Sequence, residues 1–154
     1  MFLRLFEPED AETLSHIIIQ NLRQVNALDY PKEAIEALVS LYTPAKIIEH
    51  ARHRLTIVCT IDKDAVGTAA LDHDRVREVF VVLSQHRVGI GRKLMLAIEN
   101  SAKDQHLKKL FLLAGLSAEE FYKKLGYTVV KRFDNDLNGI PLPVIRMEKK
   151  LATD

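Results

Sequence analysis

The segment with the clearest capacity for chemistry is residues 86–91, which read His-Arg-Val-Gly-Ile-Gly between an apolar strand pattern and an amphipathic helix pattern. A helix start presents unpaired backbone N–H groups and about half a positive charge, so it attracts anions where glycines let a phosphate approach. Arg87, Arg92 and Lys93 add positive charge nearby. The segment therefore predicts a diphosphate site. The alternative is a tight turn in which the two glycines only relieve steric conflict.

Two other phosphate-binding motifs do not fit the same stretch. The dinucleotide fingerprint requires a third small residue where Leu94 stands, and no strand ending in an acidic residue follows about 20 residues later. A Walker loop requires a glycine-lysine-serine/threonine run, which the sequence lacks. These absences disfavour a dinucleotide and a nucleotide held by a Walker loop as the phosphate ligand.

The N-terminal third predicts a short strand followed by three helices. The strand covers Leu3 to Phe6, and Pro8 with the acidic residues after it favours a helix start. Further helices are expected to begin near Pro31 and Pro44. The apolar positions expected to face inward are Ala11, Leu14, Ile17, Ile18, Leu22, Ile35, Leu38, Val39, Tyr42, Ile47, Ile48 and Ala51.

The middle of the chain changes from helical to strand-like patterning. Leu55 to Ile61 and Ala65 to Leu71 are β-branched or apolar runs, and the turn-forming residues 62–64 between them predict a hairpin. Val76 to Leu83 is the next predicted strand, and it runs directly into the glycine segment.

The C-terminal part predicts a helix, a strand, a short helix and two closing strands. In chain order these are a helix from Ile90 with its stripe at Leu94, Ala97, Ile98 and Ala102, then Lys109 to Leu113, Ser117 to Leu125, Tyr127 to Arg132 and Val144 to Lys149. Ser117 with Glu120 has the capping-box pattern, and Gly126 is expected to end the short helix. The polar stretch Asp134 to Pro143 is expected to form a loop between the closing strands.

Composition limits the class of protein. At 154 residues the chain fits a single domain over residues 1–154. Lys plus Arg total 22 and Asp plus Glu total 21, so a net charge of +1 gives no reason to expect nucleic acid or a membrane as partner. No apolar run reaches the ~18–20 residues of a membrane span and the start lacks a signal pattern, so we expect a cytoplasmic protein. Cys59, the only cysteine, is expected to be a core thiol.

No metal site is expected. Residues 134–139 alternate oxygen ligands like the front half of a calcium loop, but Ile145 holds the twelfth position, where a glutamate is required. His50 and His53 are three residues apart on an expected helix, and without a third ligand or a neighbouring base they are expected to be surface residues.

The glycine segment resembles the coenzyme A motif of the GNAT superfamily of N-acetyltransferases. That motif is arginine or glutamine, two variable residues, glycine, one variable residue, then glycine or alanine; Gly89 and Gly91 match it, and His86 stands at its first position. Residues 118–127 are similar to the family's downstream signature of alanine, phenylalanine-tyrosine and glycine-aromatic, with Gly115 where an asparagine is often found. Both motifs occur in the family's order, and the resemblance covers essentially the whole chain.

The resemblance implies an α/β (α+β) fold with a mixed, twisted, mostly antiparallel sheet of about six to seven strands flanked by helices. It also implies acetyl-coenzyme A as acyl-donor co-substrate. The strand before the glycine turn would splay from its neighbour, and its backbone would bind the pantetheine arm and polarise the thioester carbonyl. The cofactor-binding residues that it implies are Val81, Val82, Leu83, His86, Arg87, Val88, Gly89, Ile90, Gly91, Arg92, Lys93 and Tyr122.

Two catalytic roles follow from the same resemblance. Glu78, in the splayed strand, is the candidate base that removes a proton from an ammonium group whose pKa is roughly 10. The alternative for Glu78 is a solvated strand residue paired with a lysine. Tyr122 falls on the family's tyrosine position and is the candidate acid for the departing thiolate. Its alternative is a half-buried core aromatic with a hydrated hydroxyl.

The function that the resemblance implies is N-acetyl transfer from acetyl-coenzyme A directly to a primary amine of a small molecule or peptide. Thr13 to Arg54 and Asp134 to Pro143 are the segments expected to select the amine, and neither carries a distinguishing motif. Small domains of this family are often dimeric, so the resemblance also allows a homodimer, although no residue pattern in the sequence specifies the oligomeric state. Two alternatives remain open: a non-catalytic acyl-coenzyme A sensor or partner-binding module, and a small nucleotide-binding protein.

Overall fold

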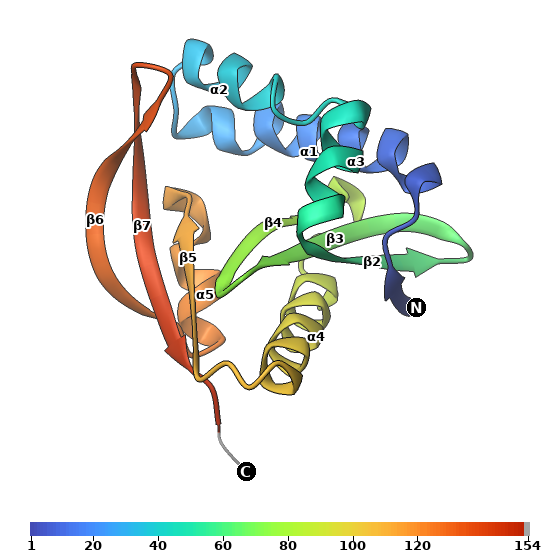
Figure 1. Cartoon of the computed structure of the whole chain (residues 1–154). Coiled ribbons are helices and arrows are strands. Elements are labelled where there is room, and N and C mark those ends of the chain that lie inside the picture. Colours follow the sequence, from blue (N-terminus) through green and yellow to red (C-terminus); the bar gives the residue numbers. More distant parts are fainter. Residues whose placement is uncertain (153–154) are drawn as a thin grey trace.

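Seven strands form one twisted sheet in the computed structural model, which describes residues 1–152 (Figure 1). The strands are β1 (Phe2–Leu5), β2 (Leu55–Ile61), β3 (Asp64–Asp72), β4 (Arg75–Val81), β5 (Lys109–Ala114), β6 (Thr128–Leu137) and β7 (Ile140–Lys150). The α-helices are α1 (Ala11–Gln24), α2 (Lys32–Val39), α3 (Pro44–His53), α4 (Ile90–Asp104) and α5 (Glu119–Lys124). The predicted α/β (α+β) class, a mostly antiparallel sheet flanked by helices, is confirmed.

The strand order is β1-β2-β3-β4-β5-β7-β6, and each neighbouring pair is antiparallel except β4 with β5. Parallel neighbours cannot be joined by a tight turn, because the chain must return to the same end of the sheet. The helix α4 makes that return between β4 and β5. Its start is therefore fixed at the end of β4, where the glycine segment lies.

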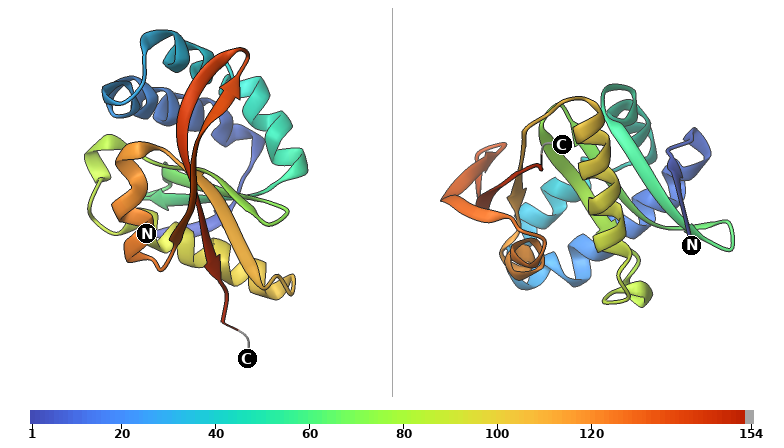
Figure 2. Two further views of the ribbon diagram at one scale, coloured as in Figure 1. Left: turned by 90° about the vertical axis from the view of Figure 1, so that its left-hand side faces the viewer. Right: turned by 90° about the horizontal axis from the view of Figure 1, so that it is seen from below.

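Each face of the sheet carries its own hydrophobic core. The helix α4 packs on one face, and α1, α2 and α3 cover the other (Figure 2). In β2, Ile57 and Cys59 face the core under α4 while Val58 faces the core under α1, because successive strand residues point to opposite faces. Cys59 is fully buried as expected, and burial raises the pKa of its thiol.

The helices of the N-terminal third follow the predicted pattern. All five inward positions predicted for α1 are buried. The helix α3 begins at Pro44, as predicted, and the Thr43 side chain accepts a hydrogen bond of 3.3 Å from the amide of Lys46 at its first turn. Within residues 1–152, none of the helices combines the length and apolar character needed to cross a membrane.

The predicted loop from Asp134 to Pro143 is wrong, because this stretch is the end of a β-hairpin. The strands β6 and β7 pair continuously to Leu137 opposite Ile140, and only Asn138-Gly139 turns the chain. Both turn residues have positive φ, 52° and 86°. An Asn-Gly pair favours a two-residue hairpin turn of this kind. The polar side chains of residues 134–138 lack the alternation of apolar and polar residues that indicates a strand.

The capping role predicted for Ser117 is also wrong. Leu116–Ala118 form a single 3-10 turn, and α5 begins after it at Glu119. The residue at the cap position is Ala118, and no side chain caps the helix there. The two acidic residues at the start of α5 still lie where they favour the helix dipole.

A buried ionic cluster joins α4 to the closing strands. Glu99 of α4 is 5% exposed, and one of its carboxylate oxygens lies 2.8 Å from Nζ of Lys149 in β7. The other oxygen accepts a 3.0 Å hydrogen bond from the hydroxyl of Tyr127. Lys149 also donates to the carbonyl of Leu125 at 2.7 Å. Because a buried carboxylate requires its partners, this cluster fixes α4 against β7.

Replacing Lys149 with Met is expected to lower the free energy of unfolding by about 3–5 kcal/mol, because the charge of Glu99 is then left buried without its cation. Urea unfolding measures this change. Lys150→Met is the matched control: Lys150 is the exposed neighbour, and its loss is expected to change stability by less than about 0.5 kcal/mol. Equal effects in the two variants would contradict a buried charge at Glu99.

Candidate functional site

The strands β4 and β5 part after a single residue pair. Arg75 pairs with Phe111, and the amide of Phe111 donates to the carbonyl of Asp74 at 3.0 Å. No further β4–β5 pair exists in the described part of the chain, and Figure 1 shows the two strands diverging from this point. Backbone groups along the two facing edges are therefore free to bind something other than each other.

A β-bulge interrupts β4 beside this opening. Thr68 pairs with Phe80 and Ala70 with Arg77, so Glu78 and Val79 together oppose one residue of β3. Glu78 has a φ of 59°, in the left-handed region that non-glycine residues seldom adopt. A bulge redirects the side chain at its centre. The bulge therefore turns the side chain of Glu78 toward the space between β4 and β5.

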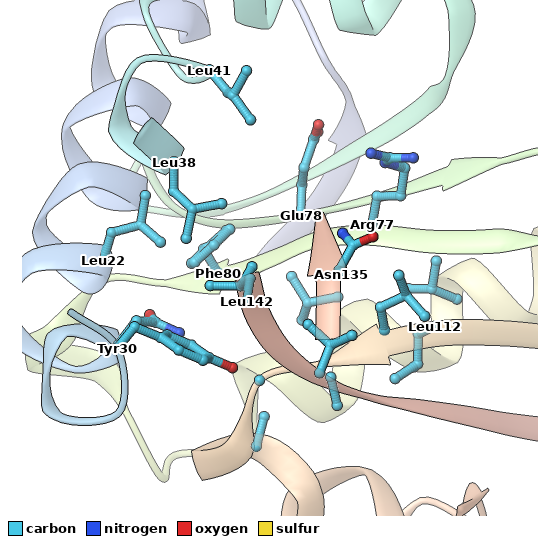
Figure 3. A pocket seen from close by; sticks show the side chains of 18 of the residues that line it. Leu22, Tyr30, Leu38, Leu41, Arg77, Glu78, Phe80, Leu112, Asn135 and Leu142 are labelled. Atoms are coloured by element: carbon cyan, nitrogen blue, oxygen red, sulfur yellow. The ribbon is translucent and has the colours of Figure 1, made fainter. Parts of the chain in front are cut away.

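The opening leads into a cavity of about 310 Å³ between β4, β5, the N-terminal helices and the β6–β7 hairpin. Figure 3 shows Leu22, Leu38 and Phe80 on one side of it, and Arg77, Glu78 and Asn135 together on the other. The further polar residues that line it are Asn26, Tyr30, Tyr42, Arg75 and Tyr122. The cavity thus has an apolar wall and a polar, charged wall.

Both segments expected to select an acceptor line this cavity. The helical segment contributes Leu22 and Tyr30, and the hairpin contributes Asn135. The hydroxyl of Tyr30 donates to the carbonyl of Pro143 at 2.7 Å and accepts from the amide of Leu116 at 3.3 Å. These two hydrogen bonds join the helices, the hairpin and the 3-10 turn before α5 at one point of the cavity wall.

Glu78 is a mostly buried carboxylate, with its side chain 10% exposed. Burial raises its pKa, although Arg54 and Arg77 act in the opposite direction. The guanidinium of Arg54 forms an ion pair with it, and Nδ1 of His50 lies 3.4 Å from the same carboxylate oxygen. The expected lysine partner is therefore replaced by an arginine. His50 is half-buried beside Glu78 and was wrongly placed on the surface, whereas His53 is exposed.

Tyr122 lines the same cavity and is 8% exposed. Its ring meets those of Phe121 and Tyr127 edge-on, with centroids 5.0 and 5.9 Å away. Burial raises the pKa of its hydroxyl, which therefore keeps its proton at physiological pH. No residue between 1 and 152 forms a hydrogen bond with that hydroxyl. It is a protonated donor without a partner in the cavity wall.

The glycine segment forms a turn rich in unpaired amides. The amide of His86 donates to Leu83 and that of Lys93 to Gly89, but the six amides from Arg87 to Arg92 have no acceptor among residues 1–152. Gly89 has a φ of 89°. A Cβ on Gly91 would lie 3.0 Å from the ring of Phe121. Backbone conformation therefore explains the glycine at position 89, and the close approach of Phe121 explains the one at position 91. The six unpaired amides are a separate feature that neither explanation accounts for.

The side chains at this turn divide into two groups. Nε2 of His86 lies 2.8 Å from the carbonyl of Val81, which also accepts a 2.8 Å hydrogen bond from the side chain of Asn21. The three cations expected to assist anion binding, Arg87, Arg92 and Lys93, are exposed and form no ion pair within the described chain. His86 stabilises the turn, and the cations are available to a ligand.

One backbone amide directly after β4 already has a hydrogen-bond partner. The strand ends at Val81, two residues earlier than predicted, and the amide of Val82 donates to the carbonyl of Val66 at 2.8 Å. Leu83 begins a 3-10 turn that leads to the glycine segment. Contacts of Val81, Val82 and Leu83 with a pantetheine arm stay a prediction.

The site has cations that the sequence analysis missed. Arg75 and Arg77 line the cavity, and Arg54 holds Glu78. The alternation Arg75-Val76-Arg77 carried a signal for the first two, because a buried Val76 puts both arginines on the opposite face of β4. Across residues 1–152 no group of three or more His, Cys, Asp or Glu side chains is arranged to hold a metal ion.

Comparison with known proteins agrees with this geometry. A family model for the acetyltransferase (GNAT) domain matches residues 26–151. A GCN5-related N-acetyltransferase from Rhodopseudomonas palustris is 30% identical, with a TM-score of 0.91 over 97% of this chain and 95% of that one. The search of curated proteins found no match.

Two more distant structures share the fold. The PaiA N-acetyltransferase of Thermoplasma acidophilum, solved with coenzyme A, is 21% identical, with a TM-score of 0.80 over 97% of this chain and 99% of that one. The protein yncA of Salmonella typhimurium, solved with acetyl-coenzyme A, is 16% identical, with a TM-score of 0.70 over 100% of this chain and 95% of that one. The matched model spans the bulge, the glycine turn and the parted strands, and the chain therefore belongs to the acetyltransferase (GNAT) domain family.

Proposed function

We propose that this protein transfers an acetyl group from acetyl-coenzyme A directly to the primary amine of a small molecule or peptide. The observation that carries the proposal is the run of six unpaired amides at residues 87–92, placed where β4 leaves β5. Coenzyme A in PaiA and acetyl-coenzyme A in yncA support the same donor. The family to which the chain belongs supports the reaction class.

The residues of the turn fit a diphosphate. Unpaired amides at a helix start, with the positive end of the helix dipole behind them, are a general anion site. Arg87, Arg92 and Lys93 supply mobile positive charge around it. The free edges of β4 and β5 would then bind the amide groups of the pantetheine arm between them. In this arrangement the donor enters from the α4 end of the opening.

Glu78 takes the proton of the acceptor. Acetyl-coenzyme A supplies an acetyl group as a thioester, and the amine forms the new C–N bond to its carbonyl carbon as the C–S bond breaks. The amine attacks only as the free base, so an ammonium proton must first leave. The raised pKa of Glu78 makes its carboxylate a better acceptor for that proton, and His50 stands beside it. Arg54 holds the carboxylate at the cavity edge.

Tyr122 supplies a proton to the departing sulfur. Its hydroxyl is protonated and has no partner within the described residues, so it is free to donate. The products are then an amide and a free thiol. The nitrogen loses two protons in all: Glu78 takes the ammonium proton, and the second, lost after the C–N bond forms, replaces the proton that Tyr122 gave to sulfur. Release of the proton on Glu78 to water returns both residues to their starting states.

Three predictions from the sequence stay predictions beside this proposal. They are a single domain over residues 1–154, a cytoplasmic location and a homodimer. The alternative of an acyl-coenzyme A sensor differs from the proposal in one measurable respect, because a sensor binds the donor and releases no thiol with any amine.

Gly89→Ala is expected to weaken acetyl-coenzyme A binding at least about 10-fold, because a left-handed alanine costs roughly 1–2 kcal/mol and the turn relaxes away from its anion-binding shape. Isothermal titration calorimetry measures the affinity. Gly139→Ala is the matched control, since Gly139 also has a positive φ and open space around its Cα. We expect the two variants to lose similar amounts of stability. Only Gly89→Ala should also lose affinity for acetyl-coenzyme A. Unchanged affinity in Gly89→Ala would argue against the turn as the donor site.

Glu78→Gln is expected to lower kcat by about 100-fold, within the usual range for loss of a general base. In the wild type, kcat at saturating amine should fall as the pH drops through the raised pKa of Glu78, since only the carboxylate accepts a proton. The glutamine variant should lack that acid limb. Glu33→Gln, on the exposed face of α2, should keep the wild-type profile. A wild-type pH profile in Glu78→Gln would exclude Glu78 as the base.

Tyr122→Phe is expected to lower kcat at least about 10-fold with little change in the KM for acetyl-coenzyme A, because it removes a proton donor and keeps the ring contacts. Thiol release measures the rate, and thermal unfolding should be unchanged. Tyr127→Phe should behave in the opposite way, losing stability through Glu99 and keeping kcat. Full turnover by Tyr122→Phe would leave the tyrosine with a packing role alone.

A further inference from the structure

An unpaired arginine stands in the cavity wall. Arg75 lines the cavity, and its Nε is buried without a hydrogen-bond partner. Within residues 1–152 its guanidinium forms no ion pair, unlike those of Arg54 and Arg77. Burial and the neighbouring Arg77 lower its pKa, so the surroundings work against its charge. A guanidinium in that state gains most from an anion that the chain itself does not supply.

Arg75 lies on the face of the sheet where the acceptor is expected to bind. Val76 is buried in the core under α4, so the flanking Arg75 and Arg77 lie on the face covered by α1–α3. Arg75 forms the one residue pair that closes the opening between β4 and β5. The glycine turn lies at the other end of β4. Arg75 is therefore separate from the proposed diphosphate site.

The charges along the cavity do not balance. Its charged lining residues are Arg75, Arg77 and Glu78. Glu78 is engaged by Arg54, and Arg77 lies 3.6 Å from Asp72, which Arg54 also contacts at 3.6 Å. Arg54 and Arg77 thus share the two carboxylates, and Arg75 contacts neither. The excess positive charge belongs to Arg75 and lies in a partly buried wall, where it is weakly screened.

We infer that the acceptor amine carries a carboxylate, which Arg75 binds while the apolar wall of the cavity holds the rest of the molecule. This inference deepens the proposed function and rests on it. Arginine suits the role because its planar guanidinium binds a carboxylate through two parallel hydrogen bonds. The leucines opposite Arg77 and Glu78 favour an apolar body on the acceptor (Figure 3). A polycation is disfavoured, because Arg75 and Arg77 repel it.

The test measures thiol release from acetyl-coenzyme A with L-leucine, L-phenylalanine and L-lysine, each against its own amide, and with spermidine. An amide keeps the size of the amino acid and removes its negative charge. The measured quantity is the ratio of kcat/KM for the acid over its amide, compared between variants. The different pKa values of the two amines cancel in that comparison.

The wild type is expected to favour the acids, and Arg75→Gln should lower the acid-over-amide ratio at least about 10-fold through the KM of the acid. The KM for acetyl-coenzyme A should not change. Arg75→Lys keeps the charge and should restore part of the ratio. Arg52→Gln removes the same charge from the exposed face of α3, and its ratio should equal that of the wild type.

Two outcomes overturn the inference alone: a kcat/KM calculated per free amine that is higher for spermidine or the amides than for the acids in the wild type, or an unchanged ratio in Arg75→Gln. The wild-type comparison stands even where a variant fails to fold. A different outcome overturns the proposed function as well, namely the absence of thiol release with every amine. Calorimetry with acetyl-coenzyme A then tells whether donor binding survives.

Discussion

The parting of β4 from β5 is the constraint on which the rest of the structure depends. Hydrogen bonding between neighbouring strands is normally continued along their length, because unpaired backbone groups in a protein interior are unfavourable. Here it ends after Arg75 and Phe111, and the sheet divides into two halves held by the helices around them. The cavity occupies the space between the halves. Continued pairing would remove both the cavity and the free edges that face it.

Burial then decides the chemistry of the groups at this opening. The same loss of water raises the pKa of Glu78 and of Tyr122, although one is needed as a base and the other as a donor. The two residues lie on different elements, β4 and α5, and both line the cavity beside the parted strands. Arg54 acts against the rise in the pKa of Glu78, because its positive charge favours the carboxylate form. The site thus combines a carboxylate and a neutral phenol in one partly dry space.

Local patterns in the sequence predicted most of the framework, and long-range contacts account for most of what they missed. Apolar spacing located α1 and α4, and β-branched runs located β2 and β3, because these patterns follow from burial on one or two faces. The β6–β7 hairpin was missed although Asn138-Gly139 signalled it, since the strands beside the turn are polar. The partnership of Glu78 with Arg54 joins residues 24 positions apart across two strands. No local spacing specifies such a pair.

The packing of Phe121 against Gly91 links two parts of the molecule mechanically. A methyl group at position 91 would press on that ring, so the turn at the start of α4 rests directly on α5. The next residue of α5 is Tyr122, which lines the cavity. The proposed donor turn and the cavity wall are thus connected by the packing of one aromatic ring, and a larger residue at position 91 would disturb both.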